Sequence, residues 1–431
     1  SSGSAALSSS GGSADDVVAV TMLIRAFQSR GHEAASLDPL DLLPKAELKV
    51  LNPATYGFSE SEWDRPLQLG ALHDMEGAFD GLLGNPDLDG DGATTMRELM
   101  SFLETVYCGA IGAEYMHING LRRVNWIRER CECHIPELSK EDRLGLLSRL
   151  AHAELFESLL ATKFNTAKRF GVEGLESIVP GMLAMVETAA DHNVEQVVIG
   201  MPHRGRLNVL QGVMRKPKEM IFKEFQGIGQ DVEEADDWGF SGDVKYHLGT
   251  SNDRIVKKRN GDEQRMHLTL LPNPSHLEAV APLVLGKARA KADLMGDEQC
   301  ARVLPVILHG DAAFAGQGIV YETMQLARVP SYYTGGSIHI VCNNQIGFTT
   351  NPDAARSTPY STDLGKAFSA PIFHVNSDKI EDVARVFDLA TAYRQVSVLF
   401  MYRYTLRESC SQCDSLPLTY LTSSSGGRAT S

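Results

Sequence analysis

The chain has 431 residues and a formal net charge of −14, with 43% hydrophobic and 22% charged residues. This length predicts two or three domains, and the composition is typical of a globular protein. The acidic balance argues against a nucleic-acid surface, which needs clustered Lys and Arg, and no apolar run approaches the ~20 residues that span a bilayer. Seven Cys without regular spacing indicate a reducing compartment.

The amino-terminal part is expected to be mainly helical. Residues 1–15 are rich in Ser, Gly and Ala and predict a flexible lead-in. Apolar residues then recur at helical spacing over Asp16–Arg30, Thr95–Tyr107 and Lys140–Lys163. We therefore predict a smaller, mainly helical region over residues 16–173.

From residue 174 the pattern changes to short apolar strands that alternate with helices. The predicted strands are Gln196–Ile199, Met266–Leu271, Val303–Leu308, Ile338–Val341 and Ile372–Val375. This alternation predicts an α/β domain over 174–395, with a parallel sheet between two helical layers and a ligand site beyond the carboxyl ends of its strands. Residues 396–431 become Ser/Thr-rich and show no periodic element after Tyr404, so we expect a disordered tail.

Two of the predicted strands are followed by loops with metal-ligand chemistry. His309-Gly310-Asp311 follows one strand, and Asn343-Asn344-Gln345-Ile346 follows the next. The separation of 344 − 311 = 33 positions leaves room for one helix and one returning strand, which brings both loops to the same sheet edge. The Asp311 carboxylate, the Asn344 amide oxygen and the Ile346 carbonyl could then bind Mg²⁺, with two diphosphate oxygens and a water completing an octahedron.

The loop after His309 is also suited to a diphosphate. Small residues (Gly310, Ala312, Ala313 and Gly316) let backbone N–H groups approach phosphate oxygens, and the start of a helix favours negative charge. A plain βαβ turn would explain Gly-Asp alone, but two such loops one crossover apart favour a site. A Rossmann site does not fit, because no strand is followed by G-x-G-x-x-G with an acidic residue about 20 positions on. The pattern predicts a site for thiamine diphosphate and Mg²⁺.

Longer motifs extend over about residues 16–395. The longest is HGDAAFAGQGIVYETMQLARVPSYYTGGSIHIVCNNQIGFTT, and others are IRAFQSRGHEAASLDPL, YGFSESEWDRPLQLG, GMPHRGRLNVL, GDVKYHLG, NPSHLEAVAPLVLGKARAK and STPYSTDLGKAFSAPIFHVNSD. On these residues the chain resembles the thiamine-dependent decarboxylating component of 2-oxoglutarate dehydrogenase. The HRGRLN and NPSHLEA segments separate it from pyruvate dehydrogenases and transketolases, which share the metal motif.

The resemblance implies roles for further residues. Arg204 stands where a family arginine contacts the diphosphate, and an always-charged planar fork suits that anion. His203 and His247 resemble histidines that orient the 2-oxo acid and move protons. Ser275 and Leu277 match positions that line the cofactor and substrate pocket.

Structural alternatives stay open for these side chains. Without the family, His203 or His247 would be interpreted as a satisfied structural histidine. Ser275 with Glu278 also has the spacing of a capping box, which is compatible with a place in the pocket wall.

The resemblance also implies a reaction and partners. The expected activity is thiamine diphosphate-dependent oxidative decarboxylation of 2-oxoglutarate, a step of the tricarboxylic acid cycle. The succinyl group would pass to a lipoyl group on a partner succinyltransferase of the multienzyme complex. Family members form homodimers, and they lie in the mitochondrial matrix in eukaryotes and in the cytoplasm in bacteria.

The carboxyl-terminal part departs from the family pattern. Family members are longer and add a pyrimidine-binding domain, whereas VSVLFMYRYTLRESCSQC follows Gln395 here. We therefore keep an alternative function, that of a truncated, catalytically incomplete chain that binds cofactor phosphates or associates with full-length subunits.

An acidic loop is a second departure. Its spacing fits an EF-hand, with Asp87, Asp89, Asp91 and Glu98 as Ca²⁺ ligands of a regulatory sensor. Asn85-Pro86 breaks the entering helix, and Thr94 takes a usually aliphatic position, so an ordinary acidic loop is the alternative. Cys131-Glu-Cys133-His134 has no second ligand pair at zinc spacing.

Overall fold

The computed structural model describes residues 12–41, 47–67, 94–133, 137–226, 246–405 and 419–424. The chain folds as two units. The first contains the described residues up to Glu137, apart from 37–42 and 117–119, and the second contains those two segments and the residues from Leu138 onward. Among the described helices, none combines the length and the apolar character that a membrane crossing requires.

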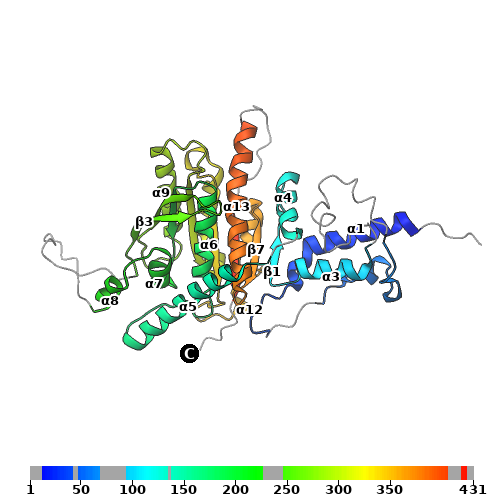
Figure 1. Cartoon of the computed structure of the whole chain (residues 1–431), viewed down its shortest axis with the longest axis horizontal. Coiled ribbons are helices and arrows are strands. Elements are labelled where there is room, and N and C mark those ends of the chain that lie inside the picture. Colours follow the sequence, from blue (N-terminus) through cyan, green and yellow to red (C-terminus); the bar gives the residue numbers. More distant parts are fainter. Residues whose placement is uncertain are drawn as a thin grey trace, which may run out of the picture. The chain divides into compact units, whose positions relative to one another are not determined.

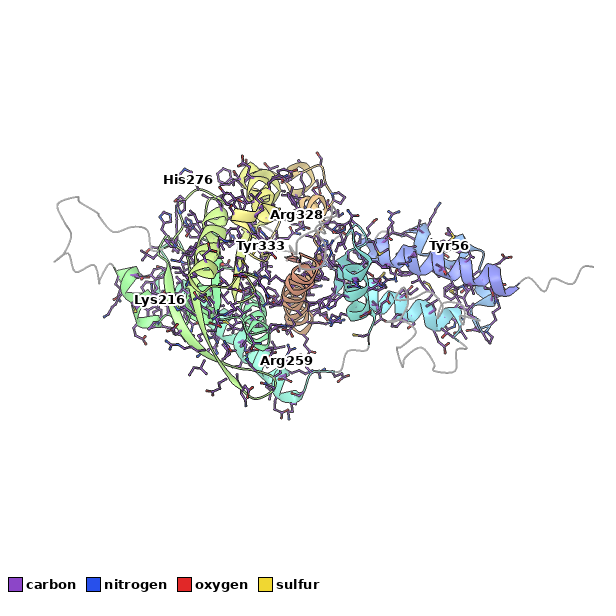
Figure 2. All side chains as sticks on the ribbon, turned by 90° about the horizontal axis from the view of Figure 1, so that it is seen from above. Tyr56, Lys216, Arg259, His276, Arg328 and Tyr333 are labelled. Atoms are coloured by element: carbon purple, nitrogen blue, oxygen red, sulfur yellow. The ribbon has the colours of Figure 1, made fainter. Side chains whose placement is uncertain are left out.

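The first unit is mainly helical, as predicted. It contains α1 (Gly12–Arg30), α3 (Met96–Tyr107), α4 (Leu121–Glu132), the strand β1 (Ile111–Glu114) and 3-10 turns at Gly31–Ala34, Lys49–Leu51, Pro53–Tyr56 and Glu60–Glu62. Val20, Leu23, Ile24 and Phe27 recur at helical spacing and give α1 one buried face. Tyr56, in one of the short turns, is labelled in Figure 2.

The second unit is built on a mostly parallel sheet (Figure 1). Its strands are β2 (Gln196–Gly200), β3 (Thr250–Lys257), β4 (Glu263–Leu270), β5 (Val303–Gly310), β6 (Ile338–Asn343), β7 (Ile372–Asn376) and β8 (Thr419–Ser424). They lie in the order β7-β8-β6-β5-β2-β4-β3, and among them β3 alone runs antiparallel to its neighbour. The predicted α/β class is confirmed.

Helices cover both faces of this sheet. They are α5 (Lys140–Lys163), α6 (Ile178–Asp191), α7 (Arg206–Asn208, continued by a π-helical turn to Val213), α8 (Lys218–Gln226), α9 (Val280–Leu294), α10 (Asp311–Gly316), α11 (Gly318–Gln325), α12 (Pro352–Ala355) and α13 (Ile380–Thr405), with 3-10 turns at Leu326–Arg328, Pro330–Tyr332 and Asp363–Phe368. Strands β2, β5 and β7 are buried at nearly every position, which requires cover on both sides.

Helix α9 approaches the sheet closely over the strand that leads to the predicted site. A Cβ on Gly200, at the end of β2, would lie 2.4 Å from a methyl group of Val284, so only glycine permits this approach. Val198 and Ile307 pack with α9 in one apolar cluster. Helices α6 and α13 lie side by side (Figure 1), with the ring of Phe387 against Gly181. These contacts fix the strand ends from which the site residues extend.

The structure differs from the disorder expected after residue 395. Helix α13 continues to Thr405, and Thr419–Ser424 forms β8, which pairs in parallel with both β6 and β7. This strand is held by backbone pairing with two neighbouring strands. Its Ser/Thr-rich sequence lacks the alternation of apolar and polar residues that would have predicted a strand.

Candidate active site

Four loops that contain the predicted site residues other than His247, which precedes β3, meet at one edge of the sheet. They follow β6, β5, β2 and β4, which are neighbours in that order and run parallel, so that their carboxyl ends share one edge. The register places Gly310 of β5 opposite Cys342 of β6, and Gly200 of β2 opposite Ile307 of β5. The predicted metal, phosphate and substrate residues therefore extend from adjacent strands.

Asp311 begins α10 and is only 3% exposed. Burial raises the pKa of its carboxyl group, while Arg356 and backbone N–H donors, including that of Gln345, oppose the rise. The Gln345 donor shows that the loop after β6 closes onto the loop after β5. The Asp311 Oδ2 atom lies 3.7 Å from Arg356 Nη1, whereas Oδ1 is buried and has no hydrogen-bond partner among the described residues.

The loop after β6 turns tightly at Asn344. Its side-chain oxygen accepts a hydrogen bond of 3.1 Å from the N–H of Ile346, and Gln345 between them has a φ of 58°. A Cβ on Gly347 would lie 4.0 Å from the Cβ of Ala312. Ile346 is 43% exposed. The two predicted metal-binding loops are therefore in contact.

This edge of the sheet fits a divalent cation and a diphosphate. A buried carboxylate oxygen without a partner is unfavourable unless a ligand completes it. Gly310 has an ordinary φ of −84°, and a Cβ there would meet no atom within 4 Å, so the described chain does not itself require glycine at this position. Its small size leaves room for a phosphate close to the backbone. The described residues hold no group of three His, Cys, Asp or Glu placed for a metal, and the predicted set includes one such side chain.

His203 and His247 lie next to each other. Their ring centroids are 5.0 Å apart, and Phe170 and Tyr246 pack around the His203 ring at 5.4 and 5.9 Å. The Ser275 hydroxyl lies 2.9 Å from Nε2 of His247, which ties that ring to the loop after β4. The structure thus brings three predicted residues from three loops together.

The surroundings of His203 favour its neutral form. Burial lowers the pKa of His203, and the positive charges of His247 and Arg206 lower it further. Its Nε2 atom is buried and has no hydrogen-bond partner among the described residues. Nε2 is therefore the ring nitrogen of His203 that remains for a hydrogen bond to a ligand.

Arg204 follows His203 on the loop after β2. Its Nη1 donates a hydrogen bond of 3.1 Å to the carbonyl of Gly171. Burial raises the pKa of Cys342 to about 12, Asp311 adds to the rise, and Arg204 opposes it. Both charges therefore act on the same buried thiol at the end of β6.

The remaining predicted residues lie at the rim of this edge. Ala313 is partly buried in the first turn of α10. Leu277 is 54% exposed and follows Ser275 on the exposed loop after β4, which His276 marks in Figure 2.

Comparison with known proteins agrees with this geometry. The family model of the dehydrogenase E1 component matches residues 149–407, more than half of the chain. The chain belongs to this family. The resemblance drawn from the sequence is confirmed, and membership of the dehydrogenase E1 family implies thiamine diphosphate as the cofactor.

Relatives of this E1 family member are mitochondrial 2-oxoglutarate dehydrogenases. The chain is 47% identical over 381 residues to that of Dictyostelium discoideum, 45% over 379 to that of Schizosaccharomyces pombe and 44% over 394 to that of Saccharomyces cerevisiae. The alignments cover 88%, 87% and 89% of this chain, but 36%, 36% and 37% of the relatives. The chain thus spans about a third of the length of the curated relatives it matches.

Arg206 is a site residue of this E1 chain that sequence reasoning missed. It is fully buried, and its guanidinium donates hydrogen bonds to the carbonyls of Met201, Leu248 and Leu271 at 3.2, 2.8 and 2.6 Å. Burial lowers its pKa to about 10, so it stays charged at neutral pH. Arg206 joins the loops that contain the two histidines and Ser275. The sequence signal for it is the second arginine of the HRGR motif.

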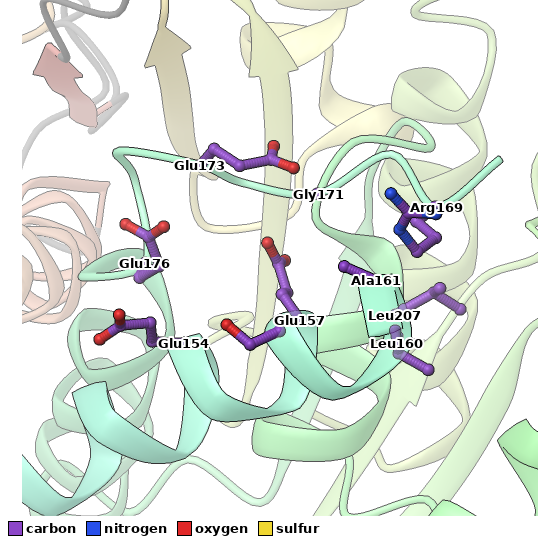
Figure 3. A pocket seen from close by; sticks show the side chains of 10 residues that line it. Glu154, Glu157, Leu160, Ala161, Arg169, Gly171, Glu173, Glu176 and Leu207 are labelled. Carbon is purple, nitrogen blue, oxygen red and sulfur yellow. The ribbon is translucent and has the colours of Figure 1, made fainter. Parts of the chain in front are cut away.

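A cavity of about 260 Å³ is lined in part by Gly171 (Figure 3), whose carbonyl accepts the hydrogen bond from Arg204. Its walls include four glutamates, Glu154, Glu157, Glu173 and Glu176, and Arg169. Glu157 accepts hydrogen bonds from the Val172 N–H and from Asn208 Nδ2, at 3.1 and 3.2 Å. Burial raises the pKa of Glu157 to about 7, and the neighbouring glutamates add to the rise. The cavity thus borders the segment that contacts Arg204 without containing the predicted site residues.

Most of the predicted Ca²⁺ loop lies outside the described residues, because Asp87, Asp89 and Asp91 fall within 68–93. Glu98 is described, and its carboxylate accepts hydrogen bonds of 2.8 Å from both the N–H and the hydroxyl of Thr95. These bonds form a capping box at the start of α3. Calcium binding stays a prediction, which a Ca²⁺ titration of the wild type and of Glu98→Gln would test. Of the Cys131/Cys133/His134 group, His134 also lies outside the described residues.

Proposed function

We propose that this chain provides the metal- and phosphate-binding side of a thiamine diphosphate site in an enzyme that oxidatively decarboxylates 2-oxoglutarate. The observation that supports this most is the buried Asp311 Oδ1, unpartnered among the described residues, beside the open backbone at Gly310. The names of the relatives support 2-oxoglutarate as the substrate and the mitochondrial matrix as the compartment.

Mg²⁺ would be held by the Asp311 carboxylate, the Asn344 side-chain oxygen and the Ile346 carbonyl. The Asn344 oxygen already accepts the Ile346 N–H and has a second lone pair for a metal. Arg204 and the backbone N–H groups of Ala312 and Ala313 would hold the diphosphate. Thiamine diphosphate, when bound, supplies the electron sink that decarboxylation needs.

His203 and His247 would bind and orient the 2-oxo acid. The lowered pKa keeps His203 neutral at neutral pH, so one ring nitrogen can accept a proton while the other donates a hydrogen bond. Ser275 holds the His247 ring at 2.9 Å, and the exposed Leu277 would add an apolar wall. Arg206 would hold these loops together through its hydrogen bonds to the carbonyls of Leu248 and Leu271.

The proposed partners follow from the reaction. The succinyl product would pass to a lipoyl group on a succinyltransferase of the complex, and a second copy of the chain would form a homodimer. No nucleic acid is expected at a surface with a net charge of −14.

Calorimetry with thiamine diphosphate, with and without Mg²⁺, tests the binding part of the proposal. We expect Mg²⁺-dependent binding that Asp311→Ala abolishes and that the control Asp353→Ala, an exposed aspartate on α12, leaves unchanged. Absence of Mg²⁺-dependent binding would refute the proposal.

An assay with ferricyanide as electron acceptor tests the chemistry, with 2-oxoglutarate and pyruvate compared as substrates. We expect turnover of 2-oxoglutarate in preference to pyruvate. Cofactor binding without turnover would instead support the alternative of a catalytically incomplete chain that binds cofactor phosphates.

A further inference from the structure

A buried row of polar side chains crosses the sheet beneath the candidate site. Glu278 Oε2 lies 2.5 Å from His309 Nδ1, His309 Nε2 lies 2.9 Å from His339 Nδ1, and His339 Nε2 lies 2.9 Å from the Ser337 hydroxyl. All four residues are at most 7% exposed. The row joins the loop after β4 to strands β5 and β6.

This row is an exception in an apolar environment. The other residues of β5 from Val303 to Leu308 are apolar and buried, and Ile338 and Ile340 flank His339 in the same way. Apolar side chains of similar volume would avoid the burial of a carboxylate and two imidazoles. Glu278 also has a φ of 68°, a left-handed conformation that is strained for a residue with a long side chain. Buried polar rows and strained residues persist mainly where a site needs them.

Hydrogen bonds engage both ring nitrogens of each histidine in the row. A carboxylate only accepts, so His309 Nδ1–H donates to Glu278. Burial, and then the nearby His309, lower the pKa of His339, so its ring is neutral. One hydrogen bond joins His309 Nε2 to His339 Nδ1, and another joins His339 Nε2 to the Ser337 hydroxyl. Each imidazole is thereby held in one orientation.

The row ends directly behind the proposed ligands. His309 is two residues before Asp311, and Glu278 directly follows Leu277 on the loop that contains Ser275. The ring of Phe314, on the helix that Asp311 begins, packs edge-on against His309 at 4.8 Å and against His339 at 6.3 Å. A shift of the His309 ring would therefore act on the loop after β4 and on the start of α10 together.

We infer that Glu278 and His309 are positioning residues for the metal end of the site: their hydrogen bond holds the Ser275 loop against β5 and sets Asp311 for its ligand. His339 and Ser337 hold the His309 ring from its other side. This inference rests on the proposed function, because the ligand it positions for is Mg²⁺ with thiamine diphosphate.

Glu278→Asn isolates the hydrogen bond from the backbone strain, since Asn tolerates the left-handed conformation but is too short to reach His309. We expect it to lower Mg²⁺ affinity in the presence of thiamine diphosphate by roughly 10–100-fold, as loss of outer-shell partners does in metal sites. Glu278→Gln, which keeps an acceptor oxygen at the same reach, should restore most of this affinity. Asp253→Asn is the matched control, because it alters a His–carboxylate pair of 2.7 Å with His267 on the exposed sheet edge and should change nothing.

Nitrogen NMR of the histidine rings measures the hydrogen bonding of the row directly. If these residues only stabilised the fold, the ring signals would not change in parallel with the Mg²⁺ affinity. Glu278→Asn should shift the ring-nitrogen signals of His309 away from their wild-type positions. If Glu278→Asn does not fold, Ser337→Ala trims the far end of the row and should alter the His339 signals, with a smaller loss of affinity.

The outcomes separate this inference from the proposed function. A wild type that binds no cofactor overturns both. A wild type that binds, with affinity and ring signals unchanged in the folded Glu278→Asn or in Ser337→Ala, overturns the positioning role alone.

Discussion

The imidazole of His203 lies 5.0 Å from that of His247, with their planes 34° apart. Such proximity lets a positive charge on His247 disfavour protonation of His203. Arg206 adds a further positive charge close to His203 and also anchors the loops on which both rings depend. A neutral imidazole at a strand edge can accept a proton in general acid–base chemistry near neutral pH.

His203 is expected to titrate below the usual range of a histidine. Because the unfolded chain takes up this proton at the ordinary pKa and the folded chain only at a lower pH, His203 makes the fold less stable as the pH falls through that window. His247→Gln should move the His203 midpoint upward without restoring it fully, since burial is the largest cause. Proton NMR of the ring measures both midpoints. The exposed His152→Gln on α5 is the control, and a wild-type midpoint at or above the ordinary value would contradict the prediction.

Gly310→Ala is expected to fold normally and to bind the cofactor poorly. A methyl group there meets no atom of the described residues within 4 Å, but it would occupy the space proposed for a phosphate. We expect Kd for thiamine diphosphate to rise roughly tenfold or more, equivalent to about 1.4 kcal/mol. Gly286→Ala on α9 is the matched control, because its added methyl is also unhindered, and it should raise stability by about 0.5–1 kcal/mol with Kd unchanged. Equal Kd values for both variants would argue against the phosphate position.

Asp311→Asn should stabilise the cofactor-free chain while removing its response to Mg²⁺. The raised pKa of Asp311 means that the fold disfavours its ionised form, so the wild type is least stable at a pH above the folded pKa. The neutral amide should raise the free energy of unfolding by about 1 kcal/mol at neutral pH. The gain should be smaller in acid, where the wild-type carboxylate is itself protonated. Thermal unfolding with and without Mg²⁺ and thiamine diphosphate measures both effects. A variant that is less stable than the cofactor-free wild type would contradict this account.

The sequence predicted the sheet edge well because its signals are local. Asp311 and Asn344 each end an apolar strand, and parallel strands necessarily bring such ends together. Long-range partners gave no such signal: the bonds of Arg206 to Leu248 and Leu271, and of Glu278 to His309, join residues 31 to 65 positions apart. The Ser275-x-x-Glu278 spacing is that of a capping box, whereas the Glu278 carboxylate accepts a hydrogen bond from a histidine on β5. Strand β8 could not be predicted from its own residue pattern, because it forms through backbone pairing with β6 and β7.

Glu157 supports Arg204 through a short chain of contacts. Its carboxylate accepts the N–H of Val172, and the preceding residue, Gly171, accepts the Arg204 guanidinium. Its pKa of about 7 lies above the ordinary 4.5, so the folded chain keeps this proton while the unfolded chain loses it. The stability of the fold therefore falls as the pH rises from about 4.5 to about 7 and then levels off.

Glu157→Gln should remove this loss while keeping an oxygen for Val172 and offering an amide N–H to Glu173 across the cavity. We expect the free energy of unfolding of the variant to exceed that of the wild type by up to about 3 kcal/mol at pH 8, and by almost nothing at pH 4. Urea unfolding over this pH range measures the difference. Glu154→Gln, an exposed residue of α5 on the same cavity wall, should show no such pH dependence. If both variants gain the same stability at pH 8, the cause is the lower negative charge of the cavity. That result would contradict the role given to the buried proton of Glu157.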